Sequence, residues 1–392
     1  MQKGVLVLVL LAMALVVAGC QGGGKGAVSS SSTPFIGGSE GLRVSFLDNA
    51  PPKEILDNKQ MSFDVILRLE NVGERDIPAS KLKVTLGGIY PQDFVETGKT
   101  KPENLQNVLY SGLAGKTDPK YKLDGVKKDP EGGKIQGGID EIKFEGLTYK
   151  KLLEGNAEFP LQADFCYNYQ TKAVGDFCMR QDLTRPTAGV CDVKGTKPMF
   201  SSGAPLHVVS LDEAVGGAGK VILKFTLKAD GTGSFFKPEA IAATNKDGGC
   251  EKGNFAKENI VRVTLNTGVT GLSCSGFDNP ANVQEVNGDV RLTNGEASIT
   301  CIQSGVSFDA VQKATVTVNY NHLISASTKL LVKHLPGFES SSGGGGIQTA
   351  GVTGACQPGA KKACTTTGGK AGTQECIEAQ WTVCVENGGA LT

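Results

Sequence analysis

Residues 159–169 read Phe159-Pro160-Leu161-Gln162-Ala163-Asp164-Phe165-Cys166-Tyr167-Asn168-Tyr169. Every second residue from Phe159 onward is apolar or aromatic, and most of the residues between them are polar. Successive side chains of a β-strand point to opposite faces, so this period of two predicts a strand with one buried face. Strands with one buried and one wet face are typical of antiparallel sheets that pack in pairs.

The same alternation occurs on both sides of this stretch, in residues 62–70, 81–86, 220–228, 261–265, 316–320 and 329–333. The chain contains 53 glycines and only 6% aromatic residues, which favours short strands and turns over long helices. Brief helical signals occur only in residues 212–215 and 255–259. The pattern therefore predicts an all-β body of two antiparallel β-sandwiches.

Two spacers rich in glycine and serine divide the chain, residues 21–40 and residues 337–354. Chains of this composition are flexible linkers. We expect a first β-sandwich at 41–191, a second at 192–336 and a small Cys-rich module at 355–386.

Residues 90–141 interrupt the first predicted sandwich and are rich in lysine, glycine and aspartate. An insertion of this length exceeds an ordinary loop, so it holds short strands or has a function of its own. We expect a decorated loop that carries a small β-ribbon. The functional alternative is a contact surface.

The first 20 residues have the pattern of an export signal. Lys3 precedes the apolar residues 5–17, a run too short to span a bilayer comfortably, which takes about 20 residues. The run closes with Leu15-Val16-Val17-Ala18-Gly19-Cys20. This ending resembles the lipobox of a lipoprotein signal, in which the cysteine is lipidated, with palmitate as an expected lipid, and becomes the mature N-terminus. The alternative is an uncleaved signal anchor with an inert Cys20.

Both interpretations of the leader place the rest of the chain outside the cytoplasmic membrane. We expect the protein at the cell membrane, lipid-anchored through Cys20 and facing the extracellular side. The cysteine count agrees with export, because removing Cys20 from eleven cysteines leaves ten, an even set. In an exported chain, such a set indicates a disulfide framework. The alternative is that some of the ten are free, buried thiols.

The position of each cysteine in its strand suggests which bridges form. Cys166 and Cys178 lie out of phase with the apolar face, which favours a cross-strand bridge on the outside of a hairpin. Cys274 and Cys301 share the phase of apolar neighbours, which favours a bridge in the core of the second sandwich. Cys191 and Cys250 then remain as a pair. Spacing does not prove connectivity.

The tail contains the last four cysteines, Cys356, Cys364, Cys376 and Cys384. So short a segment cannot bury an adequate core, so cross-links are expected to replace it. Zinc ligands usually come in close pairs and no histidine lies in the tail, so disulfides are favoured over a zinc site. Trp381, the only tryptophan, is expected to cover a disulfide rather than bind a ligand.

Several segments of the body carry a family resemblance: Gly41-Leu42-Arg43-Val44-Ser45-Phe46, Asn49-Ala50-Pro51-Pro52, Leu69-Glu70-Asn71-Val72-Gly73, Cys166-Tyr167-Asn168-Tyr169 and Val318-Asn319-Tyr320. The body resembles secreted surface lipoproteins of small-genome archaea that are built from immunoglobulin-like sandwiches. The tail resembles Cys-rich modules of microbial extracellular proteins through Gly372-Thr373-Gln374-Glu375-Cys376 and the segment from Trp381 to Cys384. The resemblance implies two antiparallel immunoglobulin-like β-sandwiches plus a small disulfide-rich C-terminal module. It implies no active site. The chain departs from many archaeal surface proteins because it lacks an Asn-x-Ser/Thr glycosylation site.

No catalytic or cofactor motif emerges from the sequence. The three histidines, His207, His322 and His334, form no i, i+4 pair, and neither His-Glu-x-x-His nor Gly-x-Ser-x-Gly occurs. The carboxylates at Asp140-Glu141 and Asp230-Gly231 lack the remaining ligands of a calcium loop. We therefore expect no catalytic residue, no metal and no cofactor.

Charge is balanced, with 40 basic and 40 acidic residues, which argues against nucleic-acid partners. The expected function is a non-catalytic cell-surface lipoprotein for adhesion or envelope interaction. Its expected partners are the membrane, through Cys20, and a surface or envelope protein or glycan. One alternative is a solute-binding lipoprotein of an uptake system, a class that usually has two α/β lobes around a cleft. Another is a secreted hydrolase with residues 90–141 as its lid, which a pocket that joins several carboxylates would support.

Overall fold

The computed structural model describes residues 33–96, 108–109, 121–182, 190–241, 249–335, 359–365, 369–377, 380–381 and 384–386. The chain forms two compact units, one up to Leu335 and one from Pro336 onward. The expected all-β fold is confirmed, because the described ranges contain strands and only two short 3-10 turns, η1 (Ala79–Lys81) and η2 (Pro91–Asp93). The described ranges therefore do not form the two α/β lobes that are usual for a solute-binding lipoprotein.

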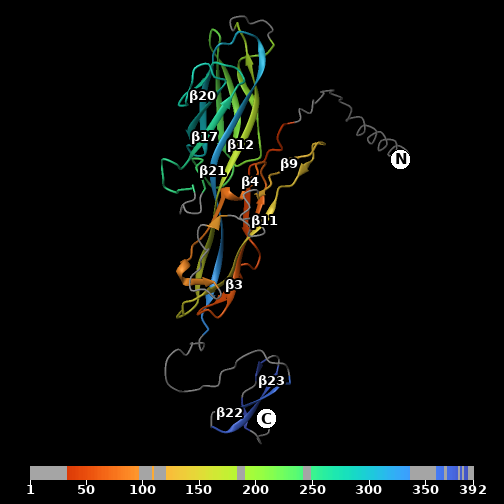
Figure 1. Ribbon diagram of the computed structural model, residues 1–392, viewed down its shortest axis with the longest axis vertical. Helices are drawn as coiled ribbons and strands as arrows, with labels where there is room; N and C mark the ends of the chain where they lie inside the picture. The colour runs from red at the N-terminus through yellow and green to blue at the C-terminus, as the bar shows by residue number, and fades with distance from the viewer. Residues whose placement is uncertain are drawn as a thin grey trace, which may run out of the picture. The chain divides into compact units, whose positions relative to one another are not determined.

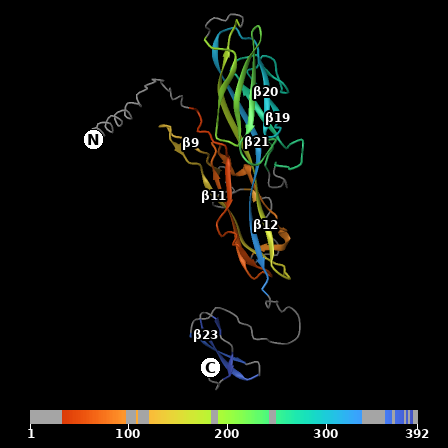
Figure 2. The same cartoon turned by 180° about the vertical axis from the view of Figure 1, so that it is seen from behind.

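Two very long strands form the centre of the first unit, β12 (Ala157–Met179) and β21 (Ala310–Lys333). They pair antiparallel along their whole length, from Ala157 opposite Val332 to Met179 opposite Ala310. At about 3.3 Å per residue this ladder is about 75 Å long. Figures 1 and 2 show the pair running through both sandwiches, so we call it the shared ladder.

The first sandwich surrounds the ladder half that contains Ala157 and Val332. One layer is a four-stranded sheet in the order β1 (Leu42–Phe46), β3 (Ser62–Asn71), β11 (Ile139–Tyr149) and β6 (Phe94–Glu96). The other layer adds β5 (Leu82–Gly87) and β7 (Val108–Leu109) beside β12, and β2 (Glu54–Leu56) beside β21. Tyr149 and Phe159 pack between the layers with ring centroids 5.6 Å apart.

The second sandwich surrounds the other half of the ladder. The ladder layer continues through β17 (Ile260–Asn266) to the edge strand β19 (Glu285–Arg291), and β16 (Ser234–Phe236) pairs with the middle of β21. The facing layer has the order β13 (Gly195–Ser201), β14 (Leu206–Gly217), β15 (Lys220–Ala229), β20 (Glu296–Gln303) and β18 (Leu272–Cys274). β13 pairs with β14 and also with β12, so it closes one side of this sandwich.

The shared ladder corrects three expectations. A division between residues 191 and 192 does not separate the sandwiches, because β12 enters the second and β21 returns to the first. The predicted strands 316–320 and 329–333 are one strand, since the residues between them keep pairing with β12. The helical signals are also wrong: residues 212–215 lie within β14, and residues 255–259 lie in the turn region before β17.

The described part of the insertion 90–141 contains the expected β-ribbon, formed by β9 (Lys127–Lys128) and β10 (Lys134–Ile135). A second short pair, β4 (Ile77–Pro78) and β8 (Lys122–Leu123), attaches it to the first sandwich. In the second unit, β22 (Lys361–Thr365) and β23 (Ala371–Ile377) form a hairpin that also pairs with β24 (Gln380–Trp381) and β25 (Val385–Glu386).

Candidate functional site

Two disulfides of the body hold covering segments against the shared ladder. Cys166 and Cys178 lie out of phase with the apolar face of β12, as predicted, but both are buried and they do not pair with each other. Cys166 bonds Cys250, and Cys178 bonds Cys191. The predicted pairs Cys166–Cys178 and Cys191–Cys250 are wrong because both members of the first pair lie on one continuous strand. Cys166 and Cys178 are twelve positions apart on this strand, which separates them by about 40 Å, whereas a disulfide needs Cα atoms about 4–7 Å apart.

The remaining bridges follow expectation where they are described. Cys274 bonds Cys301 inside the second sandwich, and both are buried. In the tail Cys364 bonds Cys384, and Cys376 is also in a disulfide. Cys20 and Cys356 lie outside the described residues, as does the side chain of Trp381.

Buried polar aromatics fill the junction between the two sandwiches. Leu42 N–H donates to the Tyr167 hydroxyl at 3.2 Å, and that hydroxyl lies 2.9 Å from His322 Nδ1. A hydroxyl can accept two hydrogen bonds and donate one, so the Tyr167 hydroxyl bridges Leu42 and His322. On the other side, the Tyr320 hydroxyl lies 3.0 Å from Thr171 Oγ1. These bonds tie the start of β1 to the middle of the shared ladder.

Tyr169 and Glu74 join the same junction to the loop before β14. The Tyr169 hydroxyl accepts from Arg75 N–H at 3.2 Å and donates to the carbonyl of Gly203 at 3.4 Å. The carboxylate of Glu74 accepts from the N–H groups of Ile36, Gly37 and Gly203. A side chain at Gly73 would collide with Tyr169, because a Cβ there would lie 2.0 Å from the hydroxyl. The junction is therefore built as a fixed contact.

Two buried acid–base groups, His322 on β21 and Glu213 on β14, have pKa values shifted in opposite directions. Burial lowers the pKa of His322 to about 4, and burial raises the pKa of Glu213 to about 7. Glu213 accepts a hydrogen bond from Cys178 N–H at 2.6 Å, and its other oxygen lies 3.8 Å from Lys197 Nζ. Both groups are therefore predominantly neutral in the folded chain at slightly acidic pH.

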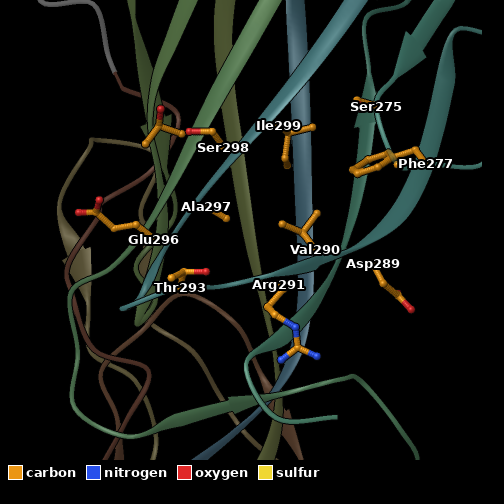
Figure 3. A pocket seen from close by; sticks show the side chains of 12 residues that line it. Ser275, Phe277, Asp289, Val290, Arg291, Thr293, Glu296, Ala297, Ser298 and Ile299 are labelled. Carbon is orange, nitrogen blue, oxygen red and sulfur yellow. The ribbon is translucent and has the colours of Figure 1, made fainter. Parts of the chain in front are cut away.

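The side of the second sandwich opposite β13 is only partly closed. β18 pairs with β20 at residues 301–303, and beyond β18 a single bridge between Asp278 and Asn287 reaches β19. The remaining opening is a cleft of about 540 Å³. Its lining comes from both layers: Thr226, Ser275, Gly276, Phe277, Asp289, Val290, Arg291, Thr293, Glu296, Ala297, Ser298 and Ile299. Figure 3 shows Val290 and Ile299 near its centre, with Asp289 on one side and Glu296 on the other.

The two strand edges that border this cleft have main-chain groups directed into it. Asp278 N–H donates to the Asn287 carbonyl at 3.1 Å on the side of β19 away from β17. In an antiparallel strand the main-chain N–H and C=O groups of successive residues point to opposite sides. Those of Asp289, two residues after Asn287, therefore point to the same side as those of Asn287. On β20, Ser275 N–H donates to the Thr300 carbonyl, so Ser298 likewise directs its main chain away from β15. Within the described ranges no strand pairs with Asp289 or Ser298 on these sides.

A braced loop adjoins the cleft and displays Phe255, which is 84% exposed. The guanidinium of Arg291 donates to the carbonyls of Phe255 and Glu258. Lys257 Nζ lies 2.8 Å from carboxylate oxygens of both Glu239 and Glu251. These polar contacts brace the main chain of the loop from which the Phe255 ring projects.

Sequence reasoning did not find this site. Asp289, Arg291 and Ser298 belong to ordinary alternating strands, and only their pairing partners reveal a free edge. Among the described residues, no cluster of three or more His, Cys, Asp or Glu side chains could hold a metal ion. The two carboxylates of the cleft, Asp289 and Glu296, are exposed and each is ion-paired. No helix within those residues is long and apolar enough to cross a membrane.

Neither a family model nor a curated protein sequence matches the chain. Among solved structures the chain is similar to the serine-rich repeat adhesion glycoprotein Srr1 from Streptococcus agalactiae, with 9% sequence identity. That match covers 76% of this chain and 96% of the other, at a TM-score of 0.13. So low a TM-score defines neither the fold nor the function of this chain.

Proposed function

We propose that this chain is a non-catalytic cell-surface lipoprotein whose two joined sandwiches form a binding arm for the cell envelope or its surroundings. The observation that carries the proposal is the cleft of the second sandwich, where the edges of β19 and β20 direct main-chain groups toward solvent. Soluble proteins usually cover or blunt such edges, since they pair readily with other chains. An open pair of edges beside an exposed aromatic ring on a braced loop therefore supports recognition of a macromolecule.

The disulfide framework supports a place outside the cytoplasm. The bonds Cys166–Cys250, Cys178–Cys191 and Cys274–Cys301 would be reduced in most cytosols but persist in an oxidising compartment. The apolar leader that ends at Cys20 supports attachment by a lipid. The shared ladder and the polar junction suit an arm in which the two sandwiches are held together as one body.

Lipid labelling of the full chain tests this proposal. Cells expressing the wild type should incorporate radiolabelled palmitate into the protein, and Cys20→Ser should abolish this incorporation because no acceptor thiol remains. In membrane fractionation, the wild type should appear in the membrane fraction and Cys20→Ser in the soluble exported fraction. The matched control is Ser30→Cys combined with Cys20→Ser, which restores a cysteine in the spacer outside the lipobox and should remain unlabelled. Equal labelling of wild type and Cys20→Ser would refute the lipid anchor.

A further inference from the structure

We propose that the cleft of the second sandwich binds an acidic, extended polypeptide segment, which adds as a strand beside β19. This inference rests on the proposed function and specifies the partner of the same site. Addition of a strand to a free sheet edge is an established mode of peptide recognition, in which main-chain bonds supply affinity and side-chain contacts supply specificity.

The main chain of β19 defines the conformation of the bound segment. Beyond the bridge at Asn287, the N–H and C=O of Asp289 and the N–H of Arg291 lie along the free edge. Only an extended chain spaces its own donors and acceptors to match them. Across the cleft, the main chain of Ser298 offers a second, shorter edge to the same segment.

The cleft has room for a main chain because the side chains that line it near the two strand edges are small. Ser275, Gly276, Ala297 and Ser298 carry no long side chain, and the opening of about 540 Å³ falls within the usual range for ligand sites. Gly288 on β19 allows Phe277 to pack closely, because a Cβ there would lie 2.4 Å from the Phe277 ring. Phe277 thus forms one end wall of the cleft.

Charge at this edge selects an acidic partner. Asp289 is ion-paired with Lys237 at 2.7 Å and with Arg262 at 3.0 Å, so one carboxylate serves two cations. Arg291 binds two main-chain carbonyls, and no ion pair with a carboxylate involves it among the described residues. The lining acids Asp289 and Glu296 are thus each ion-paired, whereas Arg291 of the same lining pairs with no carboxylate among the described residues. A carboxylate on the bound segment opposite Arg291 would pair with it and would also speed association.

Phe255 supplies the apolar part of the contact. Its carbonyl accepts from Arg291, so the ring projects from a loop tied directly to the end of the free edge. Aromatic residues held in place at an interface are common sources of binding energy. A bound segment with an acidic residue opposite Arg291 would therefore place an adjacent apolar side chain against Phe255.

The test is selection of a phage-displayed library of linear heptapeptides on the purified mature chain carrying Cys20→Ser. We expect enriched peptides to be rich in Asp and Glu and to bind wild type and Val209→Trp equally. Val209 is the control because it is exposed on β14, outside the cleft lining. Ser298→Trp should weaken binding at least tenfold by filling the cleft, and its exposed position leaves the core intact.

Two measurements separate strand addition from a non-specific charge effect. Arg291→Gln should weaken binding of the selected peptides, whereas Arg291→Lys should retain their preference for acidic residues. Hydrogen exchange of the Asp289 amide should slow when a peptide binds. The proposal is overturned if no acidic peptide is enriched, if the selected peptides bind Ser298→Trp as well as wild type, or if exchange at Asp289 is unchanged. Since the selection uses purified protein, such a failure would leave the lipid-labelling result at Cys20 unaffected.

Discussion

Replacing Cys166 and Cys250 together by alanine should lower the free energy of unfolding by about 4.5 kcal/mol, as expected when a long loop loses its cross-link. The two residues are 84 positions apart, so their bond restricts much of the unfolded chain. The bond also holds the segment before β17 against the outer face of the ladder, where Phe236, Ile241 and Leu323 form a small second core. Equilibrium denaturation under oxidising conditions measures the loss.

The matched control is the double replacement of Cys178 and Cys191. These residues are only 13 positions apart, so the same relation predicts a smaller loss of about 3 kcal/mol. Peptide mapping without reduction should recover Cys166 joined to Cys250. Recovery of Cys166 joined to Cys178, or a larger loss from the short-range pair than from the long-range pair, would contradict the described framework.

Stability should depend on pH with opposite slopes in His322→Gln and Glu213→Gln. In the wild type, His322 takes up a proton near pH 6.5 when unfolded but only near pH 4 when folded. The contribution of His322 to the free energy of unfolding is thus complete above pH 6.5 and is lost as the pH falls toward 4. Glu213 ionises near pH 4.5 when unfolded but near pH 7 when folded. Its contribution is complete below pH 4.5 and is lost as the pH rises toward 7.

Each group therefore changes the free energy of unfolding by about 3 kcal/mol across its window, and the two changes oppose each other between pH 4.5 and 6.5. In His322→Gln only the Glu213 titration remains of the two, so the free energy of unfolding should decline relative to wild type as the pH rises. In Glu213→Gln only the His322 titration remains of the two, so the free energy of unfolding should decline relative to wild type as the pH falls. Urea denaturation at half-unit pH intervals measures both slopes. Identical pH profiles for the two variants would show that these groups titrate normally.

The strand content was predictable because alternation is a local property. Phe165, Tyr167 and Tyr169 alternate with polar neighbours, and all three are buried in β12 as the pattern requires. The length of β12 was not predictable, since period two identifies a face but not where a strand leaves one sandwich and enters another. Tyr320, Asn321, His322 and Leu323 of β21 are all buried, a pattern that resembles a strand end in sequence but marks the covered junction in the structure.

The disulfide errors have the same origin. The phase of Cys166 and Cys178 was correct, but the hairpin assumed between them does not exist. Cys274 and Cys301 were paired correctly because β18 and β20 place them directly opposite each other. The cleft could not be predicted at all. Arg291 and Ser298 differ from other strand residues only in lacking a neighbouring strand, and that property depends on the pairing of the whole sheet.

Site-specific photo-crosslinking on intact cells tests most directly whether this chain is a surface protein that binds through its open sheet edge. A benzoylphenylalanine at position 255, on the loop beside the cleft, is compared with one at position 209 on β14. We expect irradiation to join the protein to another polypeptide outside the cell from position 255, with little product from position 209. The product should diminish when Arg291→Gln is added. Equal products from both positions, or products that appear only after the cells are broken, would contradict the proposed binding arm.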